Sequence, residues 1–293
     1  MSAAAGTQTE VDRYWSDHTV RAKRFRSARQ SLRYLRQRFE LYPLFRELME
    51  LWGDHSGETL LDYGCGPGND LVGFLLYADP ARAVGIDVSP KALELARHRL
   101  ALHRIDPERF DLVQAGDADP AVPLEDASVD YVHCAGVLQH VSDPVAVLRE
   151  LRRVLAPGGR ACVMVYNRDS VYFHLYTAYL RMIREGAFAG LSVEEAFTRN
   201  TDGDACPIAR CYRPAEFAAV AAEAGFSADY RGGYFAREEL DWMRRHREEA
   251  LVSPELGDEH KEFLRELELD EQGYPRFAGR YAGIGGVHEL RPA

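Results

Sequence analysis

The chain has 293 residues, a net charge of −10 at pH 7, 46% hydrophobic residues and 28% charged residues. This length and composition fit one large α/β domain, or a domain that carries an insertion. The acidic balance argues against nucleic acid as a partner, because binding a phosphate backbone requires basic charge. No apolar run approaches the ~20 residues of a membrane-spanning helix, and residues 1–10 lack the apolar centre of a secretion signal. We therefore expect a cytoplasmic protein without a transmembrane segment.

Residues 1–56 predict a helical arm ahead of the main domain. Residues 1–12 are small and polar, and we expect them to be disordered. Apolar residues recur at helical spacing between positions 27 and 52, and Pro43 indicates a break between two helices. The segment 21–38 is basic and contains no acid. It fits either a solvated face or a patch for an anionic substrate or lipid surface.

Strands and helices alternate within residues 57–167, which predicts a core with a parallel, doubly wound sheet. Ser89-Pro90 and Asp143-Pro144 each combine a capping side chain with a proline in the first helical turn, so a helix is expected to start at each place. The segment Leu155–Gly159 predicts a turn. The expected strands are Thr59–Tyr63, Ala83–Asp87, Phe110–Gln114, Val129–Cys134 and Arg160–Tyr166.

After residue 167 the alternation changes. Residues 168–211 predict a helical insertion, rich in aromatic residues, with a turn-like loop at Asn200–Asp204. Residues 212–293 return to the core, interrupted by a second, charged helical insertion at about 237–275. We expect both insertions to form a lid over the substrate. The elements predicted around the second insertion are a helix at Pro214–Gly225 and strands at Ser227–Phe235 and Tyr281–Val287.

The most informative stretch is Leu60–Asp70, in which apolar residues and an acid precede three glycines at every second position. The glycines let the backbone turn sharply and leave no side chain between it and a ligand. A helix follows, so the turn aims free N–H groups at whatever lies above it. This is the strand–turn–helix of a nucleotide-type site in an open α/β sheet.

The glycine spacing discriminates between cofactors. A dinucleotide fold requires G-x-G-x-x-G, whereas here Asn69 stands at the third glycine position and Gly68 comes one residue early. The pattern Asp-x-Gly-x-Gly-x-Gly resembles motif I of the class I S-adenosylmethionine (SAM)-dependent methyltransferases. The resemblance implies a Rossmann-like sheet of seven strands, with the last strand antiparallel and with helical insertions that form a substrate lid.

The same resemblance implies a set of cofactor contacts. Asp87, at the end of the second strand, would hold both ribose hydroxyls, and Asp62 would reach the amino group of SAM. Asp117 would meet the adenine amino group, while Val88 and Ala118 would flank the ring. The implied cofactor-binding residues are Asp62, Gly64, Cys65, Gly66, Asp87, Val88, Asp117, Ala118, Cys134, Gly136 and Tyr14.

Methyl transfer requires the acceptor, methyl group and sulfur to be aligned and water to be excluded. His140 is the candidate base, because its ordinary pKa is about 6.5 and it leaves the fourth strand towards the site; otherwise it only packs and orients the loop. Tyr14 and Trp15 resemble an aromatic lid over SAM, or else they dock the arm on the core. The candidate substrate-binding residues are Asn167, Asp202 and Arg210.

The five cysteines lack paired metal-ligand spacing, and Cys206 and Cys211 have no histidine at a useful distance along the chain, so no metal is expected. The predicted function is SAM-dependent methyl transfer to an O or N atom of a small molecule, such as a sugar, a natural-product intermediate or a lipid-linked intermediate. Two alternatives stay open: a catalytically silent SAM-binding partner protein and, disfavoured by the glycine spacing, a nicotinamide-dependent oxidoreductase. The sequence also leaves a homodimer open.

Overall fold

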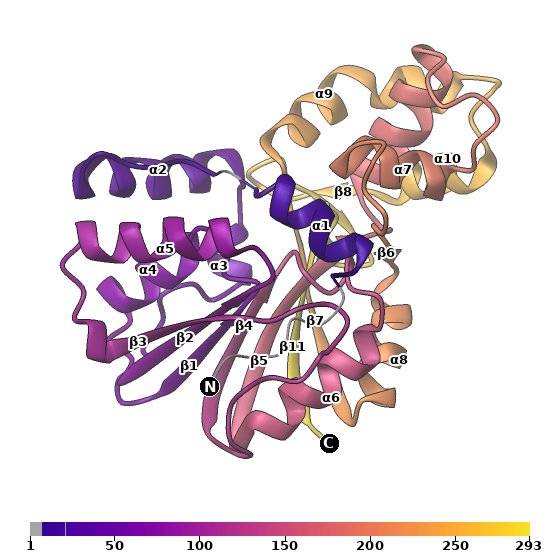
Figure 1. Cartoon of the computed structure of the whole chain (residues 1–293). Coiled ribbons are helices and arrows are strands. Elements are labelled where there is room, and N and C mark those ends of the chain that lie inside the picture. Colours follow the sequence, from indigo (N-terminus) through magenta and orange to yellow (C-terminus); the bar gives the residue numbers. More distant parts are fainter. Residues whose placement is uncertain (1–7, 21) are drawn as a thin grey trace.

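A computed structural model describes residues 8–20 and 22–293. Its centre is a twisted sheet with the strand order β3-β2-β1-β4-β5-β11-β7 (Figure 1). A short strand, β6, pairs with β5 outside this order. The strands are β1 (Thr59–Tyr63), β2 (Arg82–Asp87), β3 (Phe110–Gln114), β4 (Val129–Ala135), β5 (Leu155–Asn167), β6 (Cys211–Tyr212), β7 (Phe226–Tyr234) and β11 (Gly285–Pro292).

Strand direction confirms the predicted sheet. The neighbours β3, β2, β1, β4 and β5 are all parallel, whereas β11 runs antiparallel to both β5 and β7. Parallel neighbours bring their carboxyl ends to one edge, which is where open α/β sheets bind ligands. The last strand is therefore the antiparallel one, inserted between two strands that precede it in the sequence.

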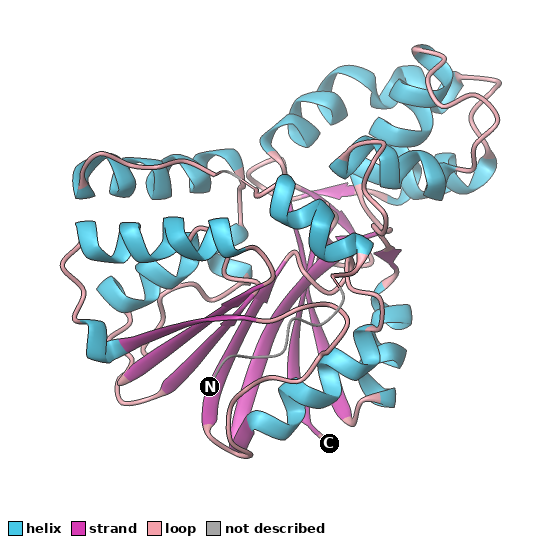
Figure 2. Ribbon diagram, viewed as in Figure 1, coloured by secondary structure: helices cyan, strands magenta, loops and turns pink. Residues whose placement is uncertain are grey.

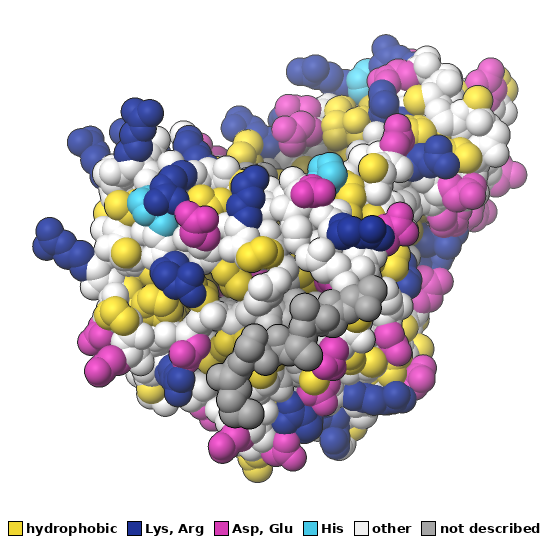
Figure 3. Space-filling model, viewed as in Figure 1, with side chains coloured by type: hydrophobic (Ala, Val, Ile, Leu, Met, Phe, Trp, Pro, Cys, Tyr) yellow, Lys and Arg dark blue, Asp and Glu magenta, His cyan; other side chains and the backbone are white. Residues whose placement is uncertain are grey.

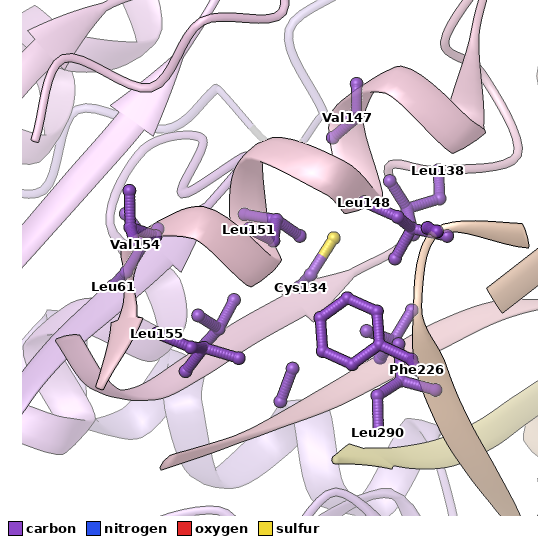
Figure 4. Close-up of a cluster of buried hydrophobic side chains, with 14 of the residues drawn as sticks. Leu61, Cys134, Leu138, Val147, Leu148, Leu151, Val154, Leu155, Phe226 and Leu290 are labelled. Carbon is purple, nitrogen blue, oxygen red and sulfur yellow. The ribbon is translucent and has the colours of Figure 1, made fainter. Parts of the chain in front are cut away.

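Helices cover both faces of the sheet. One face is covered by α3 (Phe45–Leu48), α4 (Asn69–Tyr77) and α5 (Pro90–Leu102), with α2 (Ala28–Leu41) lying over α5 (Figure 1). The other face is covered by α6 (Pro144–Val154) and α8 (Pro214–Glu223). Successive strand residues point to opposite faces, so Leu60 joins the first cluster and Leu61 the second. Figure 4 shows the second cluster, where Leu148 and Leu151 of α6 lie over Cys134.

Both predicted helix starts are capped as expected. The Ser89 side chain accepts a hydrogen bond from the Ala92 amide at 3.2 Å, and the Asp143 side chain accepts one from the Ala146 amide at 2.9 Å. In each case the next residue is a proline in the first turn, where its missing N–H leaves no intrahelical bond unmade. These local rules fix the starts of α5 and α6.

A helical lobe projects beyond the sheet edge (Figure 2). It consists of the π-type helix η2 (Tyr172–Arg184), α7 (Val193–Asp202), α9 (Arg237–Val252), α10 (Asp258–Glu266) and a small sheet of β8 (Glu268–Leu269), β9 (Pro275–Phe277) and β10 (Arg280–Tyr281). Its own hydrophobic cluster joins η2, α9 and α10. Buried Glu239 ties the lobe to the sheet, because its carboxylate accepts backbone N–H groups of Tyr172, Ala236 and Ile284 at 3.1, 2.7 and 3.2 Å.

The arm differs from the expectation of disorder over residues 1–12. Helix α1 (Glu10–Asp17) already begins at Glu10, because Thr9 and Asp12 form a reciprocal capping box; residues 1–7 lie outside the described residues. Residues 28–38 of the basic segment lie on α2, and Figure 3 shows Lys and Arg side chains over that part of the surface. Arg21 itself lies outside the described residues.

Three predicted boundaries also need correction. Leu155–Gly159 is not a free turn: β5 begins at Leu155 and bulges, since Leu155 pairs with Val129 while Arg160 pairs with Tyr131. The loop expected at Asn200–Asp204 starts later, because α7 continues to Asp202. The last strand is β11 rather than Tyr281–Val287.

Among the described residues no helix is long and apolar enough to cross a bilayer.

Candidate active site

A cavity of about 560 Å³ lies at the carboxyl ends of the parallel strands. The loops that follow β1, β2, β3 and β4 line one part of it. The arm helix α1, the end of α7 and the aromatic residues of β5, η2 and β7 line the other part. The cavity is thus one space with two chemically different halves, which we call the glycine-turn half and the aromatic half.

The glycine turn forms the floor of the first half. Gly64, Gly66 and Gly68 all have positive φ, at 78°, 52° and 73°, which only glycine adopts without strain. A Cβ on Gly64 would come within 2.1 Å of the Val137 side chain, whereas a Cβ on Gly66 would meet nothing within 4 Å. The first position is therefore closed by packing, and the second leaves open space for a ligand.

Two acids face this half from the ends of β1 and β2. The Asp87 carboxylate accepts the backbone N–H groups of Gly66 and Ser89, both at 2.8 Å, which fixes it at the rim of the turn. Asp62 is buried, and among the described residues its Oδ2 has no hydrogen-bond partner. Burial raises the pKa of Asp62 to about 7. An unpaired carboxylate oxygen at a cavity is a site for a cationic donor.

A buried ionic chain lies beside the turn, and two of its members, Arg38 and Asp70, also line the cavity. Arg38 of α2 donates to Oδ1 of Asp70 in the first turn of α4, and His133 of β4 approaches Asp70 Oδ2 at 3.2 Å. Burial opposes ionisation of Asp70, but the Arg38 guanidinium and the His133 hydrogen bond prevail and hold its pKa well below the usual range. Our sequence analysis missed this chain. Its only signals were an acid directly after the turn and an arginine among the apolar positions of α2.

The arm meets the far end of the glycine-turn half. Asp117, after β3, accepts hydrogen bonds from the backbone and hydroxyl of Ser142, while its own N–H donates to Asp12 of α1 at 2.8 Å. The carboxylate predicted to meet the adenine thus lies beside the cavity, and the N-terminal arm lies over it.

His140 and Asp202 dominate the aromatic half. His140 Nδ1 lies 2.7 Å from the Ile208 carbonyl oxygen, and a carbonyl only accepts, so Nδ1 carries the proton. Nε2 then holds a lone pair, 3.8 Å from Asp202 Oδ2. Burial lowers the pKa of His140 to about 4 and raises that of Asp202 to about 6. The Tyr166 hydroxyl donates to Asp202 Oδ1 at 3.0 Å.

Aromatic rings enclose these two residues. Trp15 of α1 packs on His140 with 4.6 Å between ring centroids, and Tyr166 meets the same ring edge-on at 5.5 Å. Tyr14 donates its hydroxyl to the Asp202 carbonyl oxygen, so the arm contacts α7 across the cavity. The remaining aromatic side chains in the lining are Tyr42, Phe45, Tyr63, Tyr172 and Tyr234.

Several predicted site residues do not line the cavity. Asn167 is buried, and its amide donates to Asp169 and Gly283 carbonyl oxygens at 2.7 and 3.1 Å, so it joins backbone segments and leaves no amide hydrogen for a substrate. Arg210 donates to the carbonyl oxygens of Val141 and Ser142 and holds the loop after β4. The other predicted residues outside the lining are Cys134, which is buried in the core, Ala118 and Tyr14.

The other predicted residues are brought together. Those that line the single cavity are Asp62, Gly64, Cys65, Gly66, Asp87, Val88, Asp117, Gly136, His140 and Asp202. A parallel α/β sheet with a glycine turn at its carboxyl edge, an acid at the end of the next strand and an enclosed second half defines an enzyme of the nucleotide-cofactor class. The architecture alone does not distinguish among the cofactors of that class.

Comparison with known proteins names the family. The chain belongs to the methyltransferase domain family, of the class I SAM-dependent type, whose sequence profile matches residues 54–206. It is 30% identical over 193 residues to the ubiquinone biosynthesis O-methyltransferase of Thiobacillus denitrificans, covering 65% of this chain and 73% of that one. It is also 35% identical over 178 residues to an uncharacterized 37.1 kDa protein in transposon TN4556 of Streptomyces fradiae, covering 55% of this chain and 49% of that one.

The structural relatives share the fold. The YcgJ protein from Bacillus subtilis superimposes with a TM-score of 0.51 and 15% sequence identity, covering 83% of this chain and 95% of that one. The chain spans about half the length of several curated relatives that it matches. The family profile covers the glycine turn and continues through η2 and α7 to residue 206.

Proposed function

We propose that this chain transfers a methyl group from SAM to an O or N atom of a small-molecule acceptor. The observation that carries the proposal is the single cavity, which joins the glycine-turn half to the half that contains His140. Named relatives include ubiquinone biosynthesis O-methyltransferases and a demethylmenaquinone methyltransferase, which supports a small acceptor. The acceptors we propose are a sugar, a natural-product intermediate or a lipid-linked intermediate.

Acceptor oxygens in the glycine-turn half support the proposal of SAM as the cofactor. Asp87 has lone pairs left for the ribose hydroxyls beside the two N–H groups it already accepts. The unpaired oxygen of Asp62 would accept a hydrogen bond from the ammonium group of SAM. The open space above Gly66 admits the body of the cofactor, and Val88 lies in the lining as an apolar wall. When bound, SAM supplies an electrophilic methyl group on a positively charged sulfur.

The aromatic half would hold the acceptor. The hydrogen bond to Ile208 keeps the His140 lone pair on Nε2, the nitrogen that lies 3.8 Å from Asp202 Oδ2, and both residues line the cavity. His140 would accept the proton of an acceptor hydroxyl as the new O–C bond forms, as a general base. Burial lowers its pKa to about 4, so the ring is neutral at pH 7 but is a weaker base than the free imidazole expected from the sequence. An amine acceptor, already nucleophilic when neutral, needs less of this assistance. The Trp15 and Tyr166 rings exclude water from the reacting atoms.

Calorimetric titration with SAM, S-adenosylhomocysteine and NADH tests the cofactor assignment. We expect both adenosyl compounds to bind and NADH not to bind; binding of NADH without SAM would refute the proposal. Acceptor libraries built on glycosides and phenols then test turnover. A chain that binds SAM but methylates nothing, alone or with an added partner, would be the catalytically silent protein instead.

The base assignment has its own test. We expect His140→Ala to lower turnover by about 100-fold or more while SAM affinity stays unchanged, because a general base contributes at least that factor. His246→Ala, in the lobe and outside the cavity lining, is the matched control. Normal turnover of the His140 variant would reduce this residue to a packing role.

A further inference from the structure

Three side chains of metal-ligand type converge at the edge of the aromatic half. His140, Asp202 and Cys206 each offer one atom, and these atoms all lie within 4.8 Å of one another. His140 comes from the loop after β4, Asp202 from the end of α7, and Cys206 from the segment that follows α7. Spacing along the chain could not reveal this cluster, because folding brings the histidine to the other two residues.

Each ligand atom is available within the described part of the chain. The hydrogen bond from His140 Nδ1 to Ile208 leaves Nε2 with its lone pair, which is the arrangement that orients metal-binding histidines. Asp202 Oδ2 is buried and has no hydrogen-bond partner, since only Oδ1 accepts from Tyr166. Cys206 is buried, and its thiol makes only a weak contact, donating to the Ile208 carbonyl oxygen at 3.3 Å.

We propose that His140, Asp202 and Cys206 bind a zinc-type divalent cation, and that the bound cation inhibits methyl transfer. Nitrogen, carboxylate oxygen and thiolate sulfur are the ligands that Zn²⁺ takes in proteins. His140 Nε2 and Asp202 Oδ2 lie 3.8 Å apart, close to the ~3.3 Å that tetrahedral coordination at ~2.0 Å requires. The carboxylate and the thiolate neutralise the two charges of the ion, and the thiol proton leaves to solvent.

The inhibitory part rests on the proposed function. The same Nε2 lone pair that would act as the base is the one that the cation takes, so His140 cannot do both. His140 and Asp202 line the cavity, so an ion held by them would lie at its wall. The ion would also connect the loop after β4 to the end of α7, closing the edge of the aromatic half.

Equilibrium dialysis against Zn²⁺ tests the site without any acceptor. We expect one ion per wild-type chain. Cys206→Ser should weaken binding by at least about tenfold, because loss of even an outer-shell partner of a metal ligand costs about that much. Cys211→Ser, the next cysteine in the chain and outside the cluster, should bind as the wild type does. Loading with Co²⁺ should add a thiolate charge-transfer absorption that Cys206→Ser lacks. No bound zinc, or equal binding by Cys206→Ser, would overturn the proposal.

Turnover separates the two parts of the inference. Zn²⁺ should slow methyl transfer by the wild type and leave its SAM affinity unchanged, and the Cys206→Ser variant should resist this inhibition. Equal inhibition of both would refute the inhibitory role. If no acceptor is ever methylated, the proposed function fails, while dialysis and the cobalt spectrum still decide whether the cation site exists. Thermal unfolding of both cysteine variants in the presence of a chelator controls for folding.

Discussion

The unpaired oxygen of Asp62 makes cofactor binding depend on pH in a direction that can be worked out. The carboxylate has its pKa raised to about 7 by burial, and an ammonium group binds only the ionised form. With this value, about 9% of the chains carry the charge at pH 6 and about 91% at pH 8. SAM affinity should therefore rise about tenfold between pH 6 and pH 8.

The substitution Asp62→Asn removes the charge and keeps the shape. A hydrogen bond to a charged group contributes about 1.5–3 kcal/mol, so at pH 8 the variant should bind SAM about 10–150-fold more weakly. Its affinity should also stay flat between pH 6 and pH 8, because the titrating group is gone.

Calorimetry at pH 6, 7 and 8 with SAM and S-adenosylhomocysteine measures both effects. Asp111→Asn is the matched control, because Asp111 lies on β3 outside the cavity lining and pairs with Arg82. A wild-type affinity that does not change with pH, or a variant that keeps the wild-type slope, would refute the assignment of Asp62 to the ammonium group.

Two further predictions concern stability. Arg38→Met should lower the free energy of unfolding in urea by about 3 kcal/mol, because it leaves the buried Asp70 charge without its guanidinium. The control is Arg33→Met at an exposed position of the same helix, which should change this free energy by less than about 0.5 kcal/mol. Equal losses of stability in the two variants would contradict the ionic chain. Glu239→Ala should cost about 3 kcal/mol or more in thermal unfolding, since three backbone N–H groups lose their acceptor. Its exposed neighbour Glu238→Ala is the control, and equal melting temperatures would refute the anchoring role of Glu239.

The glycine-turn half could be predicted because local rules determine it. Within Leu60–Asp70 the strand is followed by an acid, three glycines and the start of a helix. The cap at Ser89 fixes the loop that follows Asp87. Each of these features depends on neighbours along the chain, through backbone sterics or an unmade hydrogen bond. The sequence therefore predicted both the parallel sheet and the location of the ligand site at its carboxyl edge.

The aromatic half could not be predicted to the same depth, because contacts distant in sequence decide it. Asn167 stood at the end of β5, where a polar residue indicates a ligand contact, but the pairing of β5 with β11 brings the Gly283 carbonyl oxygen to its amide. Similarly, the approach of His140 to Asp202 depends on how α7 packs, and no local pattern specifies that packing. The pairing of Arg38 with Asp70 depends on where α2 lies over the neighbouring helices.

The position of β11 has a consequence for how the chain acquires its structure. This strand lies between β5 and β7, yet it follows both in sequence. Until it is synthesised, β7 cannot join the sheet, and β5 presents an open edge of unpaired N–H and C=O groups apart from its short pairing with β6. A chain interrupted before residue 285 would leave the edges of β5 and of β7 unpaired at the same time. Quality control in the cell would therefore meet an aggregation-prone intermediate whose completion depends on one late segment of eight residues.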